Sequence, residues 1–141
     1  MLDRPDEARP LALELLAMLE EQPQRRIVVG IIVDFAEELA IGDEVRKLVA
    51  DAPDTPWKEA ALASLDGDLV RAADVCRSMH FAAREAESRL LAGERLLRAG
   101  HRAEGEAETE KALAFYRSVG ATFFVERAEK LLSGSAQSES A

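Results

Sequence analysis

The chain has 141 residues, of which 48% are hydrophobic, 5% aromatic and 32% charged, and its formal net charge is −9. Nucleic acids and anionic membrane surfaces both attract lysine and arginine, so this charge disfavours either of them as a partner. A protein or peptide partner, basic or apolar in character, is favoured instead. The longest apolar run, residues 27–33, is far shorter than the roughly 20 residues that span a bilayer.

The single cysteine, Cys76, cannot form an internal disulfide, and the first residues lack the basic and apolar regions of a signal peptide. We therefore expect a cytoplasmic protein. Its length is typical of one domain, and its apolar content comes largely from alanine and leucine, which favour helices over strands.

Apolar residues at helical spacing predict a first helix over residues 6–21, followed by a stop at Pro23. A second helix is predicted over residues 25–40, ended by Gly42. Residues 27–33 leave an alternative open, because β-branched residues predominate there and a buried strand would share this pattern. The rest of the sequence offers no second strand for it to pair with, which favours the helix.

The next two helices are marked by their start signals. Asp43 is predicted to cap a short helix that ends near residue 50, and a proline-rich break follows. Thr55 is predicted to be the N-cap of a helix over residues 57–65, with Pro56 in its first turn.

Glycine turns separate the helices of the C-terminal half, which are predicted over residues 69–79, 82–99, 103–119 and 122–132. The turns at Gly67 and Gly100 lie 33 positions apart, a spacing typical of helix-turn-helix repeats. Gly93 and Gly105 flank the second turn, and their small size predicts close contact between two antiparallel helices.

The helix over residues 82–99 carries two apolar stripes, which predicts that it is sandwiched between neighbours. The helix over residues 122–132 has one stripe, as expected of a terminal cap, and residues 133–141 are predicted to form a disordered polar tail. The sequence thus predicts an all-α fold, a right-handed α-solenoid of about eight antiparallel helices with a C-terminal capping helix, in one domain over residues 1–132.

This pattern resembles the tetratricopeptide repeat, with Gly67 and Asp68 at the first turn and residues 111–113 near the end of the second repeat. Two positions depart from that family: Met79 stands where alanine is usual, and Thr109 where an aromatic residue is usual.

Three segments are also similar to the C-terminal helical-repeat region of large bacterial signalling ATPases fused to adenylate cyclase or helix-turn-helix regulator domains. The segments are residues 55–61, 95–104 and 112–121, within a similarity that covers residues 26–132. The resemblance implies a sensor or scaffold arm in bacterial signalling, standing alone or cut from the end of a longer protein. The sequence holds no Gly-Lys pair, so the phosphate-binding loop of those ATPases is not carried over.

Residues that could carry chemistry are sparse. Cys76 and His80 lie four apart on a predicted helix, but the further ligands that a metal site needs are missing from the sequence. The glutamates within residues 104–110 are predicted to form a solvated face. The sequence also lacks the Gly-x-Ser-x-Gly motif that would mark a serine nucleophile. We therefore expect neither an enzyme nor a cofactor or metal site.

In tetratricopeptide arrays the first helix of each pair lines a concave face. Transferred by the glycine register, the resemblance implies a partner-binding set formed by Trp57, Glu87, Leu90, Glu94, Leu97 and Arg98. Such a groove suits a peptide that carries a basic residue and a leucine- or phenylalanine-type anchor. A packing role for Trp57 and Leu90, and plain solvation of the charged residues, are the alternatives.

The function predicted from the sequence is a non-catalytic protein-interaction module, a scaffold or sensor. Two alternatives remain open. One is a regulatory fragment that binds a small ligand or its own upstream domains within a longer protein. The other is homodimerisation through the N-terminal helix around residues 11–19.

Overall fold

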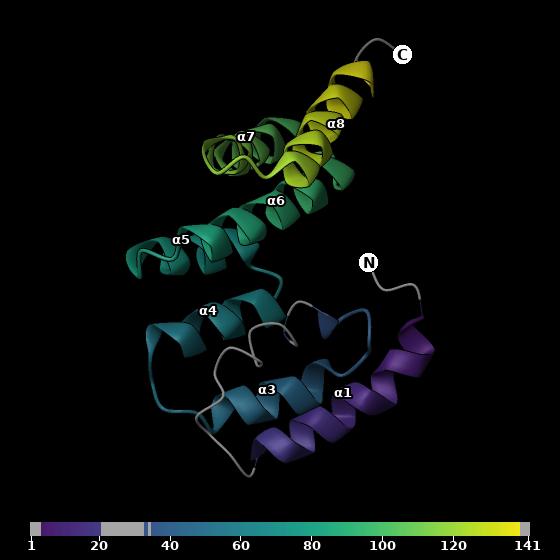
Figure 1. Cartoon of the computed structure of the whole chain (residues 1–141), viewed down its shortest axis with the longest axis vertical. Coiled ribbons are helices and arrows are strands. Elements are labelled where there is room, and N and C mark those ends of the chain that lie inside the picture. The colour runs from purple at the N-terminus through teal and green to yellow at the C-terminus, as the bar shows by residue number, and fades with distance from the viewer. Residues whose placement is uncertain (1–3, 21–32, 34, 139–141) are drawn as a thin grey trace. The chain divides into compact units, whose positions relative to one another are not determined.

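The computed structural model describes residues 4–20, 33 and 35–138. Within them the chain forms seven helices and no strand, which confirms the predicted all-α class (Figure 1). The chain divides into two compact units, Met1–Gly67 (unit 1) and Asp68–Ala141 (unit 2), where the sequence predicted a single domain over residues 1–132. The strand alternative for residues 27–33 lies outside the described residues except for Val33, which is helical and buried.

Unit 1 contains the helices α1 (Pro5–Glu20), α3 (Gly42–Ala50) and α4 (Pro56–Leu65). Its buried core is entirely aliphatic and consists of Leu16, Val33, Ala36, Leu39, Ile41, Val45 and Val49. The start of α4 is as predicted, because the Thr55 side chain accepts a hydrogen bond from the Lys58 N–H at 3.4 Å. The Lys58 ammonium donates to the carbonyls of Ala50 and Ala52, which ties the preceding loop to α4.

The segment before α3 differs from the prediction at two points. Residues 36–40 form a turn where a helix to residue 40 was predicted; Ala40 has φ +51°, and the Ile41 N–H donates to the Ala36 carbonyl at 3.0 Å. The N-cap of α3 is Ile41, without a side-chain cap, and not Asp43. Ile41 is fully buried, so core packing sets the start of α3 and leaves Asp43 in the first turn, where the helix dipole favours a carboxylate.

Unit 2 contains four helices, α5 (Leu69–Ser78), α6 (Ala82–Arg98), α7 (Arg102–Ser118) and α8 (Thr122–Ser138). Three-residue turns join them, with His80, Gly100 and Gly120 at positive φ in the middle of each turn. The residue after each of these donates its N–H five residues back, the Schellman bond that ends a helix and reverses the chain. As the two stripes predicted, α6 is sandwiched: it contacts α5, α7 and α8 (Figure 1).

Gly93 and Gly105 bring α6 and α7 into close contact, as predicted. A Cβ on Gly93 would lie 2.9 Å from the carbonyl oxygen of Gly105, and one on Gly105 would lie 3.0 Å from the carbonyl oxygen of Gly93. Thr109 completes the contact, since its buried hydroxyl donates to the Gly105 carbonyl at 2.8 Å. The buried hydroxyl of Thr109 is thus hydrogen-bonded within its own helix.

The capping helix α8 continues six residues beyond its predicted end at Leu132, so residues 133–138 of the predicted disordered tail are helical. Ser135 is buried and donates to a carboxylate oxygen of Glu106 on α7 at 2.6 Å. This bond ties the last turns of α8 to the preceding helix. Residues 139–141 of the tail lie outside the described residues.

Candidate functional site

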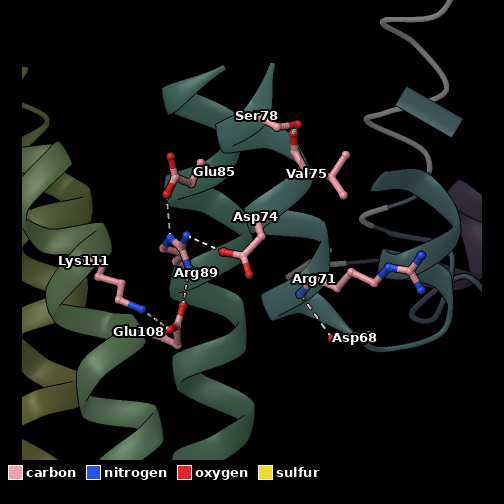
Figure 2. A network of polar contacts seen from close by, with 9 residues as sticks. All are labelled: Asp68, Arg71, Asp74, Val75, Ser78, Glu85, Arg89, Glu108 and Lys111. Carbon is pink, nitrogen blue, oxygen red and sulfur yellow. Dashed lines mark hydrogen bonds and ion pairs between the residues drawn. The ribbon is translucent and has the colours of Figure 1, made fainter. Parts of the chain in front are cut away.

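Unit 2 holds two polar assemblies, and the first is centred on the buried side chain of Arg89. Its guanidinium donates to Glu85 at 2.8 Å, to Glu108 at 2.7 Å and to Asp74 at 2.9 Å (Figure 2). These carboxylates come from α6, α7 and α5, so a single cation joins three helices. The second oxygen of Glu108 accepts from Lys111 at 2.6 Å.

The electrostatics of this network show that its charges are compensated. Burial raises the pKa of Glu108, but hydrogen bonds from Lys111 and Arg89 outweigh that effect and leave the pKa below its usual value. Burial likewise opposes the charge on Arg89, yet hydrogen bonds to Glu108, Glu85 and Asp74 raise its pKa. We therefore assign the Arg89 network a structural role, the fixing of α5, α6 and α7.

The network also corrects the prediction for the glutamates of α7. Glu104 and Glu110 are exposed as expected, but Glu108 is buried and Glu106 is half-buried. Sequence reasoning missed Arg89 as well, although one signal was present: Arg89 lies between Ala86 and Gly93 on the apolar side of α6. A charged residue within an apolar stripe requires a buried partner.

The second assembly is a cleft of about 610 Å³ formed by the end of α6, the start of α7 and residues 127–135 of α8. We call it the cationic cleft; it is lined by Glu94, Leu97, Arg98, Gly100, Arg102, Arg127, Lys130, Leu131, Gly134 and Ser135. Four of these side chains are cations and one is a carboxylate.

Ion pairs hold the walls of the cleft in place. One oxygen of Glu94 accepts from Arg98 at 2.5 Å and the other from Arg127 at 2.8 Å, which links α6 to α8. Arg102 donates to Glu106 at 2.7 Å. Hydrogen bonds from Ser135 and then from Arg102 lower the pKa of Glu106.

Three of the six predicted partner-binding residues line the cationic cleft, namely Glu94, Leu97 and Arg98. Leu90 is only 3% exposed and belongs to the core of unit 2, because the stripe on which it lies faces α7 and α8. The exposed Glu87 is paired with Arg84 at 2.9 Å and does not line the cleft.

Trp57, the remaining member of that set, belongs to α4 in unit 1 and is 40% exposed. The cleft residues that sequence reasoning missed are mostly on α8, including Arg127 and Lys130. Both lie outside the single apolar stripe predicted for that helix, and both are exposed. Their contribution to a cleft follows only from how α8 packs on α6 and α7.

Cys76 is a buried free thiol, and His80 is exposed in the turn after α5. Within residues 4–20, 33 and 35–138, histidine, cysteine and acidic side chains nowhere gather in a group of three that could hold a metal ion. None of the helices in that same part of the chain combines the length and apolar character needed to cross a membrane.

No protein-family model, curated protein or solved structure matches this chain. The resemblance to tetratricopeptide repeats and to the repeat region of bacterial signalling ATPases therefore stays a prediction from the residues of the chain itself.

Proposed function

We propose that this chain is a non-catalytic protein-interaction module that binds a peptide or protein partner in the cationic cleft of unit 2. In this proposal the helices form a right-handed, tetratricopeptide-like solenoid of about eight helices. The chain then acts as a cytoplasmic scaffold or sensor arm in bacterial signalling, as its sequence resemblance implies.

The observation that carries the proposal is the cleft itself. It takes in Glu94, Leu97 and Arg98, half of the partner-binding set that the sequence predicts. Its volume falls in the range of roughly 300–1,000 Å³ typical of ligand sites. Its lining combines five charged side chains with the apolar side chains of Leu97 and Leu131, a combination that suits a peptide with charged residues and an aliphatic anchor.

The test exploits Gly134, which lines the cleft and would place a Cβ in open space. Peptides are selected from a random display library on the intact chain, and their dissociation constants are measured for Gly134→Phe and Gly134→Ala. We expect Gly134→Phe to weaken binding at least tenfold by filling the cleft, and Gly134→Ala to leave it unchanged. Enrichment of no peptide, or equal binding by both variants, would contradict the proposal.

Homodimerisation is a second candidate function, favoured by one observation in unit 1. Leu11 and Met18 are 68% and 64% exposed, and their spacing of seven places them on one face of α1. Because Leu16 of the same helix is buried in the core, deletion of α1 would damage the unit. The variant Leu11→Gln/Met18→Gln is cleaner: conversion of a dimer to a monomer in light-scattering chromatography supports this candidate, and a monomeric parent chain excludes it.

A further inference from the structure

The cationic cleft has a charge opposite to that of the chain. The whole protein carries −9, yet Arg98, Arg102, Arg127 and Lys130 converge on one cleft together with a single carboxylate, that of Glu94. Three helices contribute these cations, so helix packing gathers them and no run of basic residues in the sequence does so.

The carboxylates at the cleft do not balance its cations. Glu94 forms ion pairs with two guanidinium groups, those of Arg98 and Arg127, and Glu106 forms an ion pair with Arg102. Lys130 is exposed and has no carboxylate partner among the described residues. Positive charge therefore remains in excess, and Arg98 and Arg127 each retain N–H donors beyond the one that Glu94 accepts.

The same ion pairs change the charge expected of the partner. From the sequence, Glu87 and Glu94 would attract a basic residue. In the structure, Arg84 neutralises Glu87, and two arginines surround Glu94. An incoming lysine or arginine would have to displace these partners and would meet like charge, which costs affinity.

We infer that the cleft binds an acidic peptide segment, with carboxylates of the peptide meeting Arg98, Arg127 and Lys130. Leu97 and Leu131, which also line the cleft, offer an apolar surface to an aliphatic side chain of the same peptide. The inference rests on the proposed function and names the chemistry of its partner. A long polyanion such as nucleic acid is disfavoured, because beyond the cleft it would meet an acidic chain.

The experiment uses the peptides selected on the intact chain and asks about their charge. We expect aspartate and glutamate to be enriched, with an aliphatic residue between them. A peptide made from the consensus should bind Arg127→Glu/Lys130→Glu at least tenfold more weakly than the parent, because two attractive contacts become repulsive. Replacing its acidic residues by lysine should reverse the preference between parent and variant.

The matched control is Lys47→Glu/Arg77→Glu, which makes the same change in net charge at exposed residues outside the cleft. It should bind the peptide with an affinity within about twofold of the parent, since neither side chain lines the cleft and exposed charges are screened by salt. The single variant Lys130→Glu breaks no ion pair, so it tests the same charge if the double variant misfolds.

The outcomes separate the inference from the proposed function. Selection of basic peptides, or equal loss of binding in both charge variants, overturns the inference. If Gly134→Phe abolishes binding while Arg127→Glu/Lys130→Glu does not, the proposal of an interaction module is supported and the inference of an acidic partner is contradicted. Displacement of the peptide by inorganic phosphate or by a single-stranded oligonucleotide at equal concentration would show a general anion site. That result also overturns the inference of an acidic peptide partner.

Discussion

The two units of this chain are stabilised by different kinds of contact. In unit 1 every buried residue of the core is aliphatic, and the ion pairs, such as Arg46 with Asp66, lie at the surface. In unit 2 the core includes an aromatic stack of Tyr116 on Phe124, at 4.7 Å between ring centroids. The buried polar and charged side chains of the described residues also all lie there, namely Ser88, Arg89, Glu108, Thr109 and Ser135.

This difference indicates which contacts fix the positions of the helices within each unit. Aliphatic packing tolerates changes that conserve volume, so unit 1 is specified mainly by which residues are apolar. A buried ion network tolerates little displacement, because each group that loses its partner is left charged in a poorly solvated place. In unit 2 the buried network therefore fixes the relative positions of α5, α6 and α7.

Removal of the Arg89 charge should have the largest effect on the stability of the chain. Arg89→Met leaves Glu108 buried with only Lys111 as partner, so we expect unfolding free energy to fall by about 3–5 kcal/mol. The matched control is Arg117→Met, which loses an exposed ion pair with Glu129 and should cost about 0–1 kcal/mol. Urea denaturation measures both, and equal costs would show that burial of Arg89 does not matter.

The glycine contact between α6 and α7 should be the next most sensitive point. A Cβ at Gly93 would lie 2.2 Å from the Thr109 hydroxyl and 2.9 Å from backbone, so Gly93→Ala forces the helices apart at a cost of about 1–3 kcal/mol. Gly134→Ala gains the same helix propensity with nothing within 4 Å, and should stabilise by up to about 1 kcal/mol. Both substitutions stabilising the chain would contradict the close packing.

One smaller change can be made in both units. Ala40, in the turn before α3, and His80, in the turn after α5, have positive φ, +51° and +57°, a conformation that favours glycine. Ala40→Gly and His80→Gly should each stabilise the chain by up to about 1 kcal/mol, since the left-handed conformation strains residues with a Cβ.

These two variants also test whether the units unfold separately. The chain has one tryptophan and one tyrosine, so Trp57 fluorescence reports on unit 1 and Tyr116 absorbance on unit 2. For independent units, Ala40→Gly shifts only the Trp57 transition and His80→Gly only that of Tyr116. Coincident shifts of both probes in both variants would show a single cooperative transition.

The sequence predicted what depends on local chemistry and missed what depends on packing between helices. Thr55 and Gly100 mark a helix start and a helix end, because capping and positive φ are properties of a few adjacent residues. Half of the predicted partner-binding set lines the cleft. The role of Arg127 was not predictable, since nothing near it in sequence shows that Glu94, 33 positions earlier, lies opposite.

The smallest expected effects are the shifts that neighbouring charges cause in the pKa of Tyr116. Burial, with a smaller contribution from Glu87 and against an opposing one from Arg127, raises the pKa of its phenol from the usual 10.0 to about 12. Because the folded-state pKa is above the unfolded one, this group contributes stability below pH 10 that is lost as pH rises towards 12. With a single tyrosine, ultraviolet absorbance follows this one titration directly.

Two variants make the titration a test of the charges around the ring. Glu87→Gln should lower the pKa of Tyr116 slightly, and Arg127→Gln should raise it slightly, while Glu110→Gln, exposed on α7, should leave it unchanged. Shifts of opposite sign would support the placement of α8 against α6 and α7 that also forms the cationic cleft. A phenol that titrates near 10 in the folded chain would contradict its burial, and with it the aromatic packing that distinguishes unit 2 from the aliphatic unit 1.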